Sequence, residues 1–108
     1  ITASPSAVAP GGTVTVNWTS KNPVTGSGFG DVIKLTFADS PINNQNSWTT
    51  GNNISGTAGS FSVVMPNFTE NWQFRYHANG AGYPTAFSNV VTVTNNPPTP
   101  TPTPTPTP

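Results

Sequence analysis

Residues 13–19 read Thr-Val-Thr-Val-Asn-Trp-Thr and alternate strictly between polar and apolar side chains. Side chains two residues apart point the same way in a strand, so Val14, Val16 and Trp18 share one face. The opposite face carries threonines and one asparagine. We therefore predict a strand with one dry face and one wet face, as in a sheet that covers a core on one side only.

The same two-residue period recurs along the chain, between clusters of glycine, proline and asparagine. Residues 1–8 form a broken edge strand, because Pro5 lacks a backbone donor. Residues 51–56 are predicted to form a turn. About seven strands at this spacing predict an all-β fold of two packed sheets, with a barrel as the structural alternative. The further predicted strands cover residues 31–37, 47–50, 60–65, 71–78 and 87–94.

Ionisable side chains are too few for most kinds of catalytic site. Charged residues make up 6 % of the 108 residues, and the only acids are Asp31, Asp39 and Glu70. We expect Asp31 to cap its own turn at the start of a strand, not to work as one of a catalytic pair. His77 is the sole histidine, so one chain cannot form a histidine-based metal site. The period of residues 71–78 places Trp72, Phe74 and Tyr76 inward, and Gln73, Arg75 and His77 outward as solvated side chains.

The composition also narrows the partners and the compartment. The chain has no cysteine, a net charge of zero and no long apolar run, so we expect no thiol chemistry, nucleic-acid binding, membrane insertion or cofactor. Serine, threonine and asparagine exceed a third of the residues, which favours a secreted or cell-surface protein. The chain begins at Ile1 rather than Met, and we expect it to be a piece of a longer protein.

Three segments resemble a known family. Residues 30–35 (Gly-Asp-Val-Ile-Lys-Leu) resemble the Asp-Trp-Ile-Gly-Leu segment of bacterial extracellular immunoglobulin-like and fibronectin-III-like modules, with Val32 where tryptophan is usual. Residues 72–76 resemble the Tyr-x-Phe-Arg-Tyr strand of these modules, and residues 88–93 their closing Ser-Asn-x-Val-x-Val strand. Eukaryotic SKICH domains share a distant version of this pattern. The resemblance implies an immunoglobulin-like two-sheet sandwich over residues 1–95, and no shared catalytic residue.

Sugars are the ligand class that aromatic and asparagine side chains of this chain suggest. Three sequons place candidate N-glycosylation sites at Asn17, Asn53 and Asn67. An exposed strip that binds carbohydrate needs flat aromatic rings on loops or short strands. The candidate rings, which could equally pack at the edges of the sandwich, belong to Phe29, Trp48 and Tyr83.

Residues 96–108 are predicted to be a separate, extended Pro/Thr-rich segment, either a glycosylated interdomain linker or a tail. Proline fixes its own φ and keeps the preceding threonine extended, so we expect a polyproline II rod roughly 35–40 Å long. Drawn out as a strand, the repeat would turn every threonine N–H to one side. We therefore expect the tail to dock along an adjacent subunit, either by adding a strand to a sheet edge or as a rod in a groove. The candidate O-glycosylation sites are Thr99, Thr101, Thr103, Thr105 and Thr107.

The sequence therefore predicts a non-catalytic extracellular structural or spacer module. One form of such a module is a repeating subunit of a glycosylated cell-surface filament, with its tail docked on a neighbour; another is a plain spacer between domains. The expected partners are other copies of the chain or neighbouring domains of the same secreted protein. The alternative is a carbohydrate-binding accessory module of a secreted polysaccharide-degrading enzyme.

Overall fold

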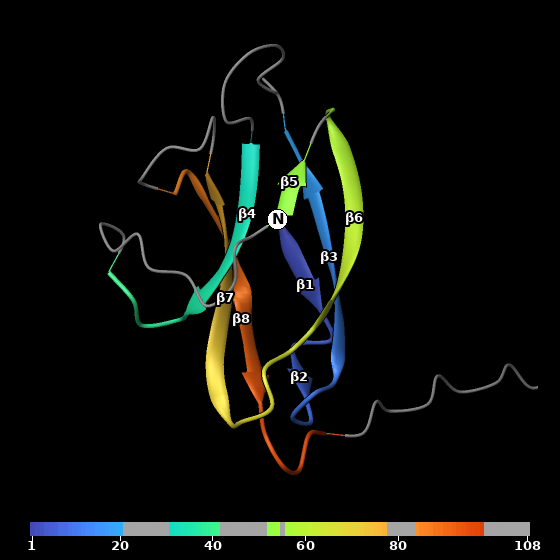
Figure 1. Ribbon diagram of the computed structural model, residues 1–108, viewed down its shortest axis with the longest axis vertical. Coiled ribbons are helices and arrows are strands. Elements are labelled where there is room, and N and C mark those ends of the chain that lie inside the picture. Colours follow the sequence, from blue (N-terminus) through green and yellow to red (C-terminus); the bar gives the residue numbers. More distant parts are fainter. Residues whose placement is uncertain (21–30, 42–51, 55, 78–83, 99–108) are drawn as a thin grey trace, which may run out of the picture.

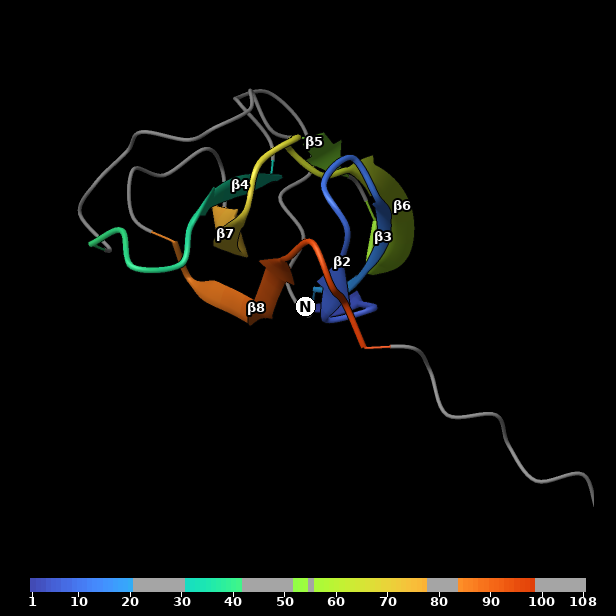
Figure 2. The same cartoon turned by 90° about the horizontal axis from the view of Figure 1, so that it is seen from below.

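The computed structural model describes residues 1–20, 31–41, 52–54, 56–77 and 84–98, with the side chains of Asn52 and Asn53 left out. These residues form two sheets, with strand orders β1-β3-β6 and β2-β8-β7-β4-β5. Strands β8, β7 and β4 lie on one side of the core, and β3 and β6 on the other (Figures 1 and 2). The strands are β1 (Thr2–Ser4), β2 (Ala7–Val8), β3 (Thr13–Thr19), β4 (Asp31–Phe37), β5 (Asn52–Ile54), β6 (Ala58–Val64), β7 (Glu70–His77) and β8 (Ala86–Val93).

Strand β3 is the central strand of the smaller sheet and confirms the alternation read from residues 13–19. Val14 and Val16 are fully buried and Trp18 is almost so, while the residues between them are exposed. On either side, β3 pairs antiparallel with β1 and with β6. The predicted all-β fold of two sheets is confirmed in the described part of the chain.

The N-terminal segment is shared between the two sheets. Its first piece, β1, pairs with β3, whereas β2 pairs parallel with β8 in the other sheet. Pro5 lies between the two pieces and follows a cis peptide bond. The expected broken strand is thus two short strands, and this segment ties one sheet to the other at the edge of the core.

The core lies between the sheets and is centred on aromatic residues of β7. Trp72 is fully buried, stacks on Phe37 at 4.8 Å between ring centroids, and meets the edge of Phe68 at 5.5 Å. Burying one such large side chain contributes about 1.5–3 kcal/mol. The core also contains Ala3, Val8, Val14, Val16, Trp18, Ile33, Leu35, Met65, Phe74, Tyr76, Val91 and Val93.

Gly59 in β6 makes room for the second buried tryptophan. It pairs with Trp18 across the two strands, and a Cβ atom at this position would lie 2.8 Å from Cζ2 of the indole. No real Cβ contact is this short, so any other residue would force the ring to move. A glycine in the strand therefore fixes where Trp18 sits.

One predicted turn is a strand. We predicted a turn over residues 51–56, but Asn52–Ile54 is the edge strand β5 and pairs with Asp31–Ile33 of β4. Asparagine and glycine favour turns locally, whereas a ladder with a distant strand depends on partners that local composition does not reveal. The strand predicted at 47–50 lies outside the described residues.

Candidate interaction surface

The side chains that could carry chemistry lie inside the fold. We predicted Arg75 and His77 to be solvated, and this is wrong: they are only 3 % and 2 % exposed. The guanidinium of Arg75 donates hydrogen bonds to the carbonyl oxygens of Ala38 (3.4 Å), Ser40 (2.7 Å) and Pro41 (3.3 Å). Residues 38–41 therefore fold over the outer face of β7, which strand periodicity alone would leave in water.

Arg75 holds residues 38–41 against β7 and also contacts neighbouring side chains on the sheet. Its Nε donates to Oε1 of Gln73 at 3.1 Å, and its guanidinium lies 5.5 Å from the centre of the Phe87 ring. Burial lowers the pKa of Arg75 from its ordinary value. Three carbonyl acceptors, an amide oxygen and an aromatic face offset the cost of removing this cation from water.

A buried acid of β4, Asp31, bonds to a tyrosine of β7. Asp31, which we predicted to cap its own turn, is 3 % exposed, and its Oδ2 accepts a hydrogen bond from the hydroxyl of Tyr76. Burial and this bond raise the pKa of Tyr76, against the opposing effect of a side-chain hydrogen bond with Ser20. Ser20 directly follows β3, so the tyrosine hydroxyl links the ends of the two sheets.

Nowhere among residues 1–20, 31–41, 52–54, 56–77 and 84–98 do three His, Cys, Asp or Glu side chains gather to hold a metal ion. The same residues contain no helix that could span a membrane.

The predicted glycan sites divide into two groups. Asn17 and Asn67 are exposed, so both sequons are accessible. The other candidates lie outside the described residues or have no described side chain. They are Asn53 in β5, the rings of Phe29, Trp48 and Tyr83, and the threonines Thr99, Thr101, Thr103, Thr105 and Thr107.

The outer face of the three-stranded sheet is an uncharged array of hydroxyl and amide groups. Asn17 of β3 lies between Thr2 of β1 and Ser60 of β6. Thr15 lies in the same way between two serines, and all of these side chains are exposed. Cross-strand neighbours on one face are about 5 Å apart, which makes this a continuous polar surface without an ion.

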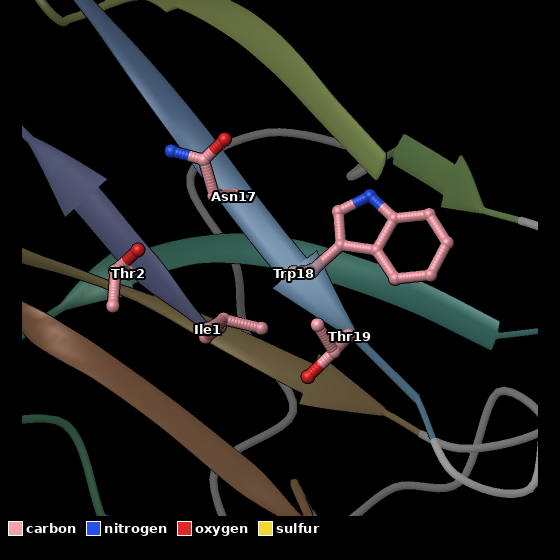
Figure 3. A pocket seen from close by; sticks show the side chains of 5 residues that line it. All are labelled: Ile1, Thr2, Asn17, Trp18 and Thr19. Atoms are coloured by element: carbon pink, nitrogen blue, oxygen red, sulfur yellow. The ribbon is translucent and has the colours of Figure 1, made fainter. Parts of the chain in front are cut away.

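A small pocket opens where β1 begins. It holds about 170 Å³ and is lined by Ile1, Thr2, Asn17, Trp18 and Thr19 (Figure 3). Three of these residues are the first sequon. Among them, Asn17 is exposed, whereas Trp18 is almost fully buried and belongs to the core.

Strand β6 lies at the edge of the three-stranded sheet, a position that strand prediction from the sequence does not reveal. Met65 donates to the carbonyl of Gly12 and Ser20 donates to that of Thr57, both at 2.8 Å. In an antiparallel pair, residues alternate between facing the partner and facing away. With the β3–β6 register, the odd-numbered residues of β6 bond to β3. The residues whose N–H and C=O groups face away are Ala58, Ser60, Ser62 and Val64.

The other edge strands in the described residues are short or capped. The backbone of β1 is capped at Ala3, whose N–H donates to Oδ1 of Asn89 (2.9 Å) and whose carbonyl accepts from its Nδ2 (3.0 Å). β2 has two residues and β5 has three. Natural sheets protect their edges by such shortening, or with charges, proline or bulges. β6 has seven residues, none of them charged and none a proline.

Sequence reasoning missed Asn89 and the β6 edge for the same reason. Asn89 caps β1 only because β1 lies beside β8, 86 residues away along the chain. The one available signal was the place of Asn89 in the Ser-Asn-x-Val-x-Val segment. That segment resembles a known family but assigns no role to the asparagine.

Comparisons of the chain with protein-family models, with curated proteins and with solved structures find no match.

Proposed function

We propose that the chain is a non-catalytic extracellular structural module that links copies of itself into a glycosylated filament. The observation that carries the proposal is the use of its reactive side chains. Arg75 holds the carbonyls of residues 38–41, and Tyr76 and Asp31 bond to each other inside the fold. These groups bond within the fold and stabilise the module, while the described cross-strand neighbours of Asn17, which are Thr2 and Ser60, present hydroxyl groups.

An immunoglobulin-like sandwich is the architecture we propose for this module. The order β1-β3-β6 corresponds to strands A, B and E of that fold, and β8-β7-β4 corresponds to G, F and C. The division of the first strand between the sheets fits the same scheme. These correspondences support the resemblance carried by residues 30–35, 72–76 and 88–93, and they add no binding function to it.

The Thr-Pro tail supplies the second half of the proposal. Residues 99–108 alternate threonine and proline without interruption, a composition that keeps a free tail extended and its backbone groups available to a partner. O-linked sugars on its threonines would keep the rod stiff and hydrated. A module with few charges on its surface gains solubility in the same way, because glycans replace the repulsion that charge normally provides.

The proposal is tested on protein from its natural source. Mass spectrometry should find hexose additions on tail threonines, and negative-stain electron microscopy should find filaments that contain the chain. Bare threonines and dispersed single modules would contradict it. Retention on insoluble polysaccharide, abolished by Trp48→Ala or Tyr83→Ala but not by Phe61→Leu, would instead establish the carbohydrate-binding alternative.

A further inference from the structure

We infer that the free edge of β6 is the acceptor for the Thr-Pro tail of a second copy of the chain. The inference rests on the proposed function, because it names the partner and the contact through which the modules assemble. It starts from the edges of the two sheets. Three of the four edge strands are short or capped, whereas β6 is long and uncharged and has no partner strand on its outer side among the described residues (Figure 1).

The hydrogen-bonding groups of the tail match those of β6 in spacing. On β6, every second residue from Ala58 to Val64 turns its N–H and C=O outward, which gives four such residues. In residues 99–107, every second residue is a threonine, which gives five. If the tail is drawn out as a strand, all five threonines turn their N–H and C=O groups to the same side. Four consecutive threonines can then face the four outward residues of β6.

The lengths agree as well. Residues 99–108 would span about 33 Å as a strand, at roughly 3.3 Å per residue. The seven residues of β6 span about 23 Å on the same basis. The tail therefore covers the whole edge and leaves a few residues to connect the two modules. Neither segment has a charged side chain, so no side-chain repulsion opposes their pairing.

The prolines limit the assembly to one added strand. The side of the tail that faces away from β6 would present proline residues, which have no N–H to donate. A further strand could not form a regular ladder there, so the sheet stops growing sideways. One tail and one acceptor edge per chain make a head-to-tail contact, which produces open filaments when the rotation does not close a ring.

The test uses full-length chains with one half of the contact removed. Ser60→Pro with Ser62→Pro deletes two outward N–H groups of β6 while the bonds to β3 remain, because those bonds come from the odd-numbered residues. Thr101→Pro with Thr103→Pro deletes two donors of the tail. The matched controls, Ser60→Thr with Ser62→Thr and Thr101→Ser with Thr103→Ser, keep every N–H.

Sedimentation velocity over a hundredfold concentration range should show self-association of the unchanged chain and of both controls. Each proline variant should associate at least tenfold more weakly. An equimolar mixture of the two proline variants restores one intact edge and one intact tail, and should give one-to-one dimers and nothing larger. The tail substitutions lie outside the sandwich, so the inference stays testable even where the β6 variant fails to fold.

Amide hydrogen exchange locates the contact. Protection of Ala58, Ser60, Ser62 and Val64 should rise with concentration in the unchanged chain and not in the Thr101→Pro/Thr103→Pro variant. A chain that stays monomeric at every concentration overturns the inference, including one whose own tail protects its own β6. Self-association of the Thr101→Pro/Thr103→Pro variant as strong as that of the unchanged chain also overturns the inference, but it does not contradict the proposed structural module. Retention on polysaccharide would instead overturn the proposed function.

Discussion

The hydroxyl of Tyr76 provides the sharpest test of how this fold is held together. Tyr76→Phe removes one oxygen and keeps the ring, which is 6 % exposed in the core. The carboxyl of Asp31, 3 % exposed, then loses the donor that it faces. Removing one donor from a buried acceptor costs about 1–3 kcal/mol. For a domain of this size, a loss of about 2 kcal/mol lowers the melting temperature by roughly 8–16 °C.

The same substitution should change how stability depends on pH. The pKa of Tyr76 is raised above its ordinary value of 10.0 by burial first and by Asp31 second. The folded chain therefore keeps this proton at a pH where the unfolded chain has lost it. The contribution to the free energy of unfolding is complete below about pH 10 and is lost as the pH rises through the raised pKa. The Tyr76→Phe variant has no phenolic proton to lose at this position, so it lacks this decline.

Urea unfolding followed by circular dichroism, repeated from pH 7 to pH 11, measures both effects. Tyr83→Phe is the matched control, since it also removes one tyrosine hydroxyl but leaves Tyr76 in place; it should keep the alkaline decline. The reasoning fails if Tyr76→Phe is as stable as the unchanged chain at pH 7, or if its stability falls with the same slope above pH 10.

Three further substitutions test other contacts. Gly59→Ala should lower the free energy of unfolding by about 1–3 kcal/mol, because the new methyl group displaces the indole of Trp18; an unchanged urea midpoint would contradict this. Arg75→Lys should lower the free energy of unfolding by about 1.5–3 kcal/mol, because a lysine ammonium cannot reach the same set of carbonyl oxygens. A melting temperature equal to that of the unchanged chain would show that the charge alone suffices and would contradict this. Asn89→Ala should cost about 1 kcal/mol and raise light scattering at high concentration, because it uncaps Ala3; identical scattering would rule out a protective role.

Burial on the two faces of β7 separates what could be predicted from what could not. The inward positions of Trp72 and Phe74 followed from a period of two, because a strand that covers a core must place apolar side chains on that side. The burial of Arg75 did not follow, since it depends on residues 38–41 folding back over the outer face. Local patterning reports which side of a strand is apolar. It does not report what other segments bring to the polar side.

The candidate surface divides in the same way. The hydroxyl-rich face around Thr15 could be expected from the alternation of residues 13–19, and the alternating tail is written directly in the sequence. The open edge of β6 could not be expected. An edge is a property of strand order, and strand order is set by pairings between residues far apart, such as Val16 with Phe61.

The sequence by itself determined that the chain forms strands, which side chains face the core in most of them, and that an uncharged Thr-Pro segment follows. These are consequences of local geometry, in which each residue's neighbours two positions away decide its face. Only the tertiary structure decided which strand lies at an edge, which edge is capped by Asn89, and that Asp31 and Arg75 are enclosed. Hydrogen bonds between distant segments settle those questions, and no local pattern encodes their partners.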